Sequence, residues 1–313
     1  MRNLGHAFSR RAAGALLLAF TLLAAPGLPL FAADAKQRRF ASPEEAMTAL
    51  VDAIKADDRK VLLGILGPEG LTLVDSGDVV ADRNARQQFA AEYERAHRLE
   101  AGGGKVVLHV GPDGYPFPVP LVPEGPVWRF DTRAGKEEIL NRRIGGNELH
   151  AIQACLAYVD AQREYYSEDR NADGLREYAQ RFASTRGKRD GLFWDTKGGE
   201  APSPLGPLVA QARIEGYGGG RSATPAAYHG YYYRIITAQG ADAPDGAYDY
   251  LAHGRMIGGF ALVAFPAQYG VSGVMTFIVN HEGVVYQKNL GPNTTAIARG
   301  VRLFNPDGSW KKA

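Results

Sequence analysis

The chain has 313 residues, of which 45% are hydrophobic and 22% charged, and its formal net charge is +2. The first 35 residues hold three arginines and one aspartate, so the remainder is close to neutral and has no broad electrostatic attraction for nucleic acid or anionic lipid. The single cysteine, Cys155, excludes an internal disulfide. It lies on the apolar side of a predicted helix, which indicates a buried thiol rather than a nucleophile.

Residues 1–35 have the pattern of a secretory signal peptide. An arginine pair precedes the apolar run 12–25, and residues 33–35 fit a small-x-small cleavage site. Pro26 and Pro29 interrupt a helix that would need about 20 apolar residues to span a membrane, which argues against an uncleaved membrane anchor. We expect no membrane span after signal removal. The protein is therefore expected to be periplasmic or secreted, and the arginine pair alone leaves the Sec and twin-arginine routes open.

Residues 42–145 are predicted to form an N-terminal α+β domain. Ser42 is expected to cap a first helix, with Pro43 at its first position. Helices followed by an antiparallel meander describe the α+β class, and the order of elements is similar to part of the NTF2-like fold. The further expected elements are a helix after Asp58, a short strand over 71–74, a helix capped by Asp82, and strands over 105–110, 115–122 and 127–131.

Residues 146–313 are predicted to form a second α+β domain. A connecting helix over 136–143 and a hinge at Gly145-Gly146 are expected to lead into a long amphipathic helix over 147–166. The glycine- and proline-rich segment 197–227 is expected to be an extended surface loop. A long helix packed on a four-stranded antiparallel sheet resembles the globular part of type IV pilins. The four strands are expected over 231–237, 259–265, 274–279 and 284–288.

Three stretches also carry a resemblance to a known family. They are Tyr165–Tyr178 (YYSEDRNADGLREY), Gly230–Thr237 (GYYYRIIT) and Gly258–Gly291. From about Ser42 to its C-terminus, the chain resembles a bacterial family known as domain of unknown function 2950. The resemblance implies no particular reaction.

The acidic segment that begins at Asp169 matches the D-x-N-x-D-G start of a calcium loop. In such loops, oxygens at alternate positions converge on the ion, and a glycine permits the sharp turn. The twelfth position is Gln180 rather than a bidentate glutamate, which predicts modest affinity. The alternative is a solvated polar turn. The expected metal ligands are side-chain oxygens of Asp169, Asn171, Asp173 and Glu177 and the carbonyl of Leu175.

No catalytic residue or other cofactor is predicted from residue spacing. The histidines form no close pair with metal-ligand spacing, and His109 and His281 are expected to be exposed. His229 is the best single candidate for a base, and a cleft that joined it to Asp249 and His253 would indicate an enzyme.

Six tyrosines are dense around the first strand of the second domain. Part of this group is expected to be core, and the rest to stack on sugar rings or to hold a peptide. We therefore expect a non-enzymatic binding or envelope-assembly protein whose partner is an envelope protein, a peptide or a glycan. The alternative is a cell-envelope hydrolase or lyase with its site near the glycine-rich loop. The tyrosines are Tyr228, Tyr231, Tyr232, Tyr233, Tyr248 and Tyr250.

Overall fold

The computed structural model describes residues 37–218 and 226–313. The expected signal peptide over residues 1–35 therefore lies outside the described residues. In the described part of the chain, no helix is both long enough and apolar enough to cross a membrane. Helices and antiparallel sheets are both present, which confirms the α+β class.

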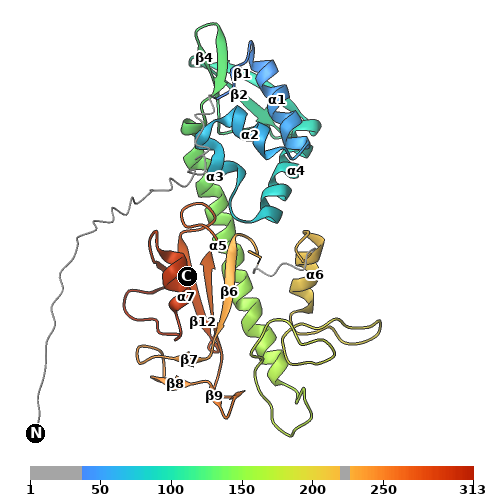
Figure 1. The fold of residues 1–313 in the computed structure, drawn as a ribbon, viewed down its shortest axis with the longest axis vertical. Coiled ribbons are helices and arrows are strands. Elements are labelled where there is room, and N and C mark those ends of the chain that lie inside the picture. Colours follow the sequence, from blue (N-terminus) through green and yellow to red (C-terminus); the bar gives the residue numbers. More distant parts are fainter. Residues whose placement is uncertain (1–36, 219–225) are drawn as a thin grey trace, which may run out of the picture. The chain divides into compact units, whose positions relative to one another are not determined.

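The first part of the chain contains four α-helices and one 3-10 turn (Figure 1). Residues 71–74 form a helix and not the expected strand, because the 3-10 turn leads directly into them and a four-residue apolar run does not distinguish the two states. The elements are α1 (Pro43–Lys55), α2 (Arg59–Leu66), η1 (Pro68–Gly70), α3 (Leu71–Val74) and α4 (Val79–Arg95).

The helix caps are partly as expected. The Ser42 side chain accepts from the amide of Glu45 and caps α1, which confirms the predicted start. Helix α4 is capped by Asp78, whose carboxylate accepts from the amide of Ala81, and not by Asp82. Asp82 already lies in the first turn of α4, where its carboxylate accepts from the amide of Ser76 at 2.9 Å.

A five-stranded antiparallel sheet follows, with β1, β2, β4 and β5 in that spatial order and β3 paired with β2. The three expected strand regions are confirmed, although the middle one divides into β3 and β4. Strand β1 was not expected, because nearly all of its residues are exposed and it has no apolar alternation. The strands are β1 (His97–Gly102), β2 (Lys105–Val110), β3 (Tyr115–Pro116), β4 (Leu121–Glu124) and β5 (Val127–Phe130).

Helix α5 (Thr132–Tyr166) is continuous, and it runs through Gly145 and Gly146, where we expected a hinge. Side chains on both sides of this glycine pair anchor the helix. Arg143 donates to the carbonyls of Thr72 and Leu73, and Asn147 donates to the carbonyl of Ser272. These contacts outweigh a helix propensity about 1 kcal/mol below that of alanine for each glycine. Whether the chain divides near residue 146 into separately folding domains stays a prediction.

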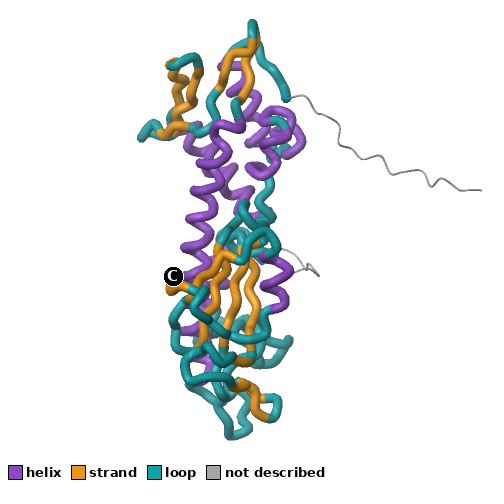
Figure 2. Tube along the Cα trace, turned by 90° about the vertical axis from the view of Figure 1, so that its left-hand side faces the viewer, coloured by secondary structure: helices purple, strands orange, loops and turns teal. Residues whose placement is uncertain are grey.

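The second large sheet has the order β14-β13-β12-β11-β6, all antiparallel, and Figures 1 and 2 show it beside α5. The four expected strands are confirmed as β6, β11, β12 and β13, whereas the short edge strand β14 and helix α7 were not expected. The elements are β6 (Tyr231–Ile236), β11 (Ala261–Pro266), β12 (Met275–Asn280), β13 (Tyr286–Asn289), α7 (Thr294–Gly300) and β14 (Lys311–Lys312).

Two small ribbons lie between β6 and β11 in the sequence. In the first, β7 (Ala238–Gln239) pairs with β8 (Tyr248–Asp249), and in the second, β9 (Leu251–Ala252) pairs with β10 (Arg255–Met256).

Two hydrophobic cores are present within residues 37–218 and 226–313. One contains buried residues from α1, α2, β2 and their neighbours, and the other buries α5 against the β6–β13 sheet. Cys155 belongs to the second core and is fully buried, and this burial raises its thiol pKa to about 12. The expectation of a buried packing thiol is therefore confirmed.

The glycine- and proline-rich segment is not extended throughout. Helix α6 (Gly206–Ile214) forms inside it, with Pro207 in its first turn. Proline is compatible with that position, and the apolar residues Leu208 and Val209 then pack against the core beside the sheet. The expectation of a continuous extended loop over 197–227 is thus wrong for this stretch.

Candidate functional site

A cavity of about 380 Å³ lies between α6, α5 and the strands β6 and β11. Its walls are almost entirely apolar or aromatic. Helix α6 contributes Leu208, Val209 and Ala212 to the wall, and strand β11 of the sheet contributes Leu262. The tyrosines of the cavity wall are Tyr158, Tyr217, Tyr228, Tyr232 and Tyr233.

Five of the six tyrosines in the dense group divide between the core and this cavity, and the partly buried Tyr248 packs against the core. Tyr231 and Tyr250 are fully buried core residues, and their hydroxyls donate to the carbonyl of Met275 and to the side-chain oxygen of Gln239. Tyr228, Tyr232 and Tyr233 face the cavity. Desolvation by burial raises the pKa of Tyr228 to about 12, so its phenol is neutral at any physiological pH.

A buried carboxylate anchors one side of the cavity wall. Asp78 is 3% exposed, and both of its oxygens accept hydrogen bonds. One oxygen accepts from the amide of Ala81 at 3.0 Å. The other accepts from the Tyr217 hydroxyl at 2.9 Å and from the amide of Gly230 at 2.8 Å. Asp78 thus joins the start of α4 to Gly230, which precedes β6, and to Tyr217 of the cavity wall.

His229 extends this polar cluster. Its Nε2 lies 3.0 Å from Oε2 of Glu215, close enough for an ion pair but not aligned for a hydrogen bond. Its ring stacks on His150 with 4.2 Å between the ring centroids, and its amide donates to the Tyr217 hydroxyl oxygen. Its φ of 49° places it in the left-handed region, which costs energy for a residue other than glycine.

Burial and the neighbouring His150 lower the pKa of His229, while Glu215 and Asp78 act in the opposite direction. The imidazole is therefore mainly neutral near pH 7. Burial, followed by the charge of Asp78, raises the pKa of Tyr217. The rings of His229 and Tyr217 are consequently neutral beside the carboxylates of Asp78 and Glu215.

These contacts limit the chemistry that the cluster can perform. The Asp78 carboxylate and the Tyr217 hydroxyl are already engaged in bonds that hold the backbone together. The pair of His229 and Glu215 has the separation for proton exchange but not the alignment of a hydrogen bond. The cavity beside it can enclose an apolar group, with tyrosine rings for stacking.

His229 was singled out from the sequence, and a cleft that joined it to Asp249 and His253 would have indicated an enzyme. Asp249 lies in the short strand β8, and His253 lies in the turn between β9 and β10. The described contacts of the His229 side chain are instead with Glu215, His150 and neighbouring tyrosines. Glu215 follows α6, which the sequence analysis treated as part of a loop.

The two histidines that were expected to be exposed are partly buried. The side chain of His109 is 15% exposed and contacts the carbonyl of Gly114. The Nδ1 of His281 is buried and has no hydrogen-bond partner within the described chain. Burial lowers the pKa of His281.

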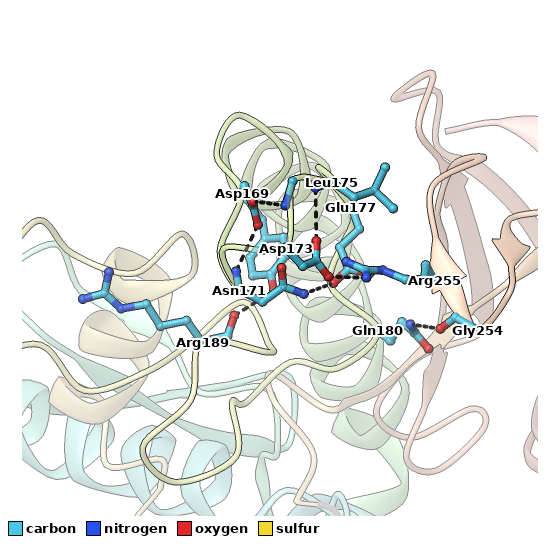
Figure 3. Close-up of polar contacts among 11 residues, drawn as sticks. Asp169, Asn171, Asp173, Leu175, Glu177, Gln180, Arg189, Gly254 and Arg255 are labelled. Carbon is cyan, nitrogen blue, oxygen red and sulfur yellow. Dashed lines mark hydrogen bonds and ion pairs between the residues drawn. The ribbon is translucent and has the colours of Figure 1, made fainter.

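The acidic loop forms a network of internal bonds (Figure 3). The carboxylate of Asp169 accepts from the amides of Asn171 and Gly174, and that of Asp173 accepts from the amide of Leu175. The Asn171 side chain donates to Glu177 at 3.2 Å. The hydrogen bond from the Gly174 amide is the first cause of the lowered pKa of Asp169.

An arginine from the β9–β10 ribbon joins this network. Arg255 pairs with the carboxylates of Asp173 and Glu177, as Figure 3 shows. Its hydrogen bond is the first cause of the lowered pKa of Asp173. The Gln180 side chain donates to the carbonyl of Gly254 at 2.8 Å. The loop thus contains acidic groups that already hold one cationic partner.

Within the described residues, no group of three or more histidine, cysteine, aspartate or glutamate side chains is arranged to hold a metal ion. Calcium loops also use amide and main-chain carbonyl oxygens, as the motif at Asn171 and Leu175 would. Calcium binding therefore stays a prediction for this loop.

Comparison with known proteins gives one match. A family model described as "Protein of unknown function (DUF2950)" matches residues 37–313. No curated protein and no solved structure matches the chain.

Proposed function

Since the chain belongs to the DUF2950 family of proteins of unknown function, we propose a function from its site. The protein is an exported, non-enzymatic binding protein of the cell envelope, and its tyrosine-lined cavity takes an apolar side chain of a peptide segment. The observation that carries this proposal is the cavity of about 380 Å³ beside α6.

The size and the lining of the cavity support a peptide side chain as the ligand. An engineered cavity of about 150 Å³ is sufficient for benzene, so the space here accommodates one large aromatic or aliphatic side chain with room to spare. Leu205, Leu208, Val209 and Leu262 provide aliphatic contacts around the tyrosine rings. A sugar would need more free hydrogen-bonding groups than such a wall offers.

The hydrogen bonding of the polar cluster supports a binding role over catalysis. A catalytic site requires a base, an oriented reacting group and a stabilising donor that all remain available to substrate. Here Asp78 and Tyr217 are occupied by structural bonds. Their contribution is to hold the cavity wall in place.

The test uses p-cresol, which has the side-chain structure of tyrosine, and methyl β-glucoside as the sugar probe. Ligand-observed NMR of the purified protein is expected to detect p-cresol but not the glucoside. Ala212→Trp should fill the cavity and abolish the signal. Ala210→Trp is the matched control, because Ala210 lies on the same helix but does not line this cavity. Binding of the glucoside alone, or an unchanged p-cresol signal in Ala212→Trp, would contradict the proposal.

A second function, a hydrolase or lyase of cell-envelope material, is favoured by one contact. The 3.0 Å separation of His229 Nε2 and Glu215 Oε2 is that of a base held by a carboxylate. Purified peptidoglycan incubated with the protein tests this alternative by mass spectrometry of released fragments. Fragments released by the natural chain and not by His229→Ala would establish the enzyme and overturn the non-enzymatic proposal.

Export rests on the sequence of residues 1–35. An arginine pair, an apolar run and a small-residue cleavage site support removal of a signal peptide. Mass spectrometry of the exported protein should find the mature N-terminus between Ala33 and Lys36. A membrane-retained chain with an intact N-terminus would overturn the proposal of a periplasmic or secreted protein.

We further propose that the acidic loop binds calcium with modest affinity. Two carboxylates and the amide of Asn171 lie within one short turn, and Arg255 is the competing cation. Calcium at a hundredfold excess over its Kd would stabilise the fold by about 2.7 kcal/mol. Asp169→Ala with Asp173→Ala should abolish this gain, whereas Arg255→Gln should strengthen calcium binding. Calorimetric melting with and without millimolar calcium measures both effects. If calcium leaves the Tm of both the natural chain and Arg255→Gln unchanged, the loop is a polar turn that does not bind calcium.

A further inference from the structure

A second cavity, of about 300 Å³, lies within the N-terminal part, between α1, α2, α4, α5 and the first sheet. It is separate from the tyrosine-lined cavity and shares no lining residue with it. Its walls are mainly aliphatic and aromatic, with Leu50, Leu62, Phe89, Phe117 and Ile139 among them. Such a wall contacts the apolar body of a ligand well but offers a polar head few partners.

This wall contains more arginines than carboxylates, and the arginines differ in whether they form an ion pair. Three arginines, Arg86, Arg142 and Arg143, line the cavity against one carboxylate, Asp82. Arg142 pairs with Glu138. Arg86 pairs with Asp57, which Arg83 also shares.

Arg143 differs from the other two arginines. Its guanidinium donates to the carbonyls of Thr72 and Leu73 at 2.6 and 2.7 Å, and both acceptors are neutral. Within the chain segments that the structure describes, no carboxylate lies within ion-pair distance of it. Two of its five N–H donors are used by these carbonyls, so others remain for an anion. Arg143 is partly buried, and a cation removed from water without an ion pair gains from an anionic ligand.

Asp82 forms no ion pair with Arg143, although burial, which lowers the pKa of the guanidinium, is opposed through space by the charges of Asp82 and Asp75. The Asp82 carboxylate accepts from the Ser76 amide at 2.9 Å and is held there as part of the turn before α4. Burial raises the pKa of Asp82, which favours its uncharged form. Asp82 therefore occupies none of the remaining N–H donors of Arg143, which stay available to an anion.

We propose that this cavity binds a small apolar carboxylate, with the carboxylate at Arg143 and the hydrocarbon among the leucine and phenylalanine side chains. Guanidinium groups bind carboxylates through two parallel hydrogen bonds, which neutral carbonyls cannot replace. The volume is about twice that of an engineered cavity that holds benzene, so the ligand has on the order of a dozen non-hydrogen atoms. Decanoate has this size.

The test measures the Kd of decanoate and of 1-decanol by isothermal titration calorimetry below their aggregation limits. Decanoate is expected to bind at least tenfold more tightly than decanol, because the two share a tail and differ in the charged head. Arg143→Met should remove this preference, and Arg142→Gln, a change at a half-exposed side chain, should weaken decanoate severalfold. Arg133→Gln is the control, since Arg133 is exposed on the same helix and does not line the cavity.

Ala85→Trp tests the location independently of the charge. Ala85 lines the cavity from an exposed position on α4, so a large side chain there blocks the space without replacing core residues. Both probes should lose binding in Ala85→Trp and keep it in Ala212→Trp, which fills the other cavity. Equal affinity for decanoate and decanol, absence of decanoate binding, or undiminished binding by Ala85→Trp would each overturn the proposal.

Discussion

Replacement of Asp78 by alanine measures how strongly this one carboxylate joins α4 to the residues before β6. The change removes the N-cap bond to Ala81, which is worth about 1 kcal/mol. It also removes the bonds from the Tyr217 hydroxyl and the Gly230 amide. Hydrogen bonds to a charged group contribute about 1.5–3 kcal/mol each.

Relief of the cost of burying a charge offsets part of this loss, so we take the lower end of that range. The expected decrease in the free energy of unfolding is about 4 kcal/mol. Asp58→Ala is the matched control, because Asp58 caps α2 through a single bond of the same length to Val61 and is exposed. It should cost about 1 kcal/mol.

Urea denaturation followed by tryptophan fluorescence compares the two variants. Hydrogen exchange at the Gly230 amide gives a local measurement, and Asp78→Ala should accelerate it about a hundredfold if about 3 kcal/mol of local stability is lost. Asp58→Ala should leave this amide unchanged. Equal unfolding costs for the two alanine variants, or unchanged exchange at Gly230, would refute the role of Asp78 as the link.

Three further predictions test other parts of the structure. Gly145→Ala should stabilise the protein by about 1 kcal/mol in thermal unfolding, because the added Cβ meets open space within a continuous helix. Gly135→Ala should instead destabilise it by at least about 2 kcal/mol, because its Cβ would lie 2.3 Å from the carbonyl oxygen of Pro118. A loss of stability in Gly145→Ala would support a hinge. Because the pKa of His229 is lowered in the folded protein, its contribution to stability is complete above its unfolded pKa of about 6.5 and is lost as pH falls through the folded value. His229→Gln should therefore flatten the decline in the free energy of unfolding between pH 7 and 5. Parallel pH curves for the natural chain and the variant would contradict this reasoning. The buried thiol of Cys155 should react with Ellman's reagent only after denaturation, and rapid reaction of the native protein would show that the thiol is accessible.

The elements that the sequence predicted well are those with a strong local signal. The period-two alternation before and after the turn at Asn280–Gly283 predicted β12 and β13, and the Ser42-Pro43 pair predicted the start of α1. Strand β1 carries no such signal, because its side chains are exposed on both faces. The helix through Gly145 depends on contacts of its flanking residues with distant loops, which no local pattern contains.

The candidate site was only partly predictable for the same reason. His229 and the tyrosines around it were visible as an unusual local group. Asp78 belongs to no distinctive local pattern, and its contacts with Tyr217 and Gly230 span 139 and 152 residues of sequence. Glu215 was assigned to a loop, because the helix before it begins in a glycine- and proline-rich stretch.

The most direct test of the proposed binding function follows the tyrosine signals during a titration. Protein with 13C-labelled tyrosine rings is titrated with p-cresol, and the ring signals are assigned by single Tyr→Phe variants. The account predicts saturable shifts for Tyr217, Tyr228, Tyr232 and Tyr233, which line the cavity, and none for Tyr269, which lines neither of the two cavities. Signals of these four tyrosines that stay unchanged at saturating p-cresol, or an equal shift of the Tyr269 signal, would contradict the tyrosine-lined cavity as the binding site.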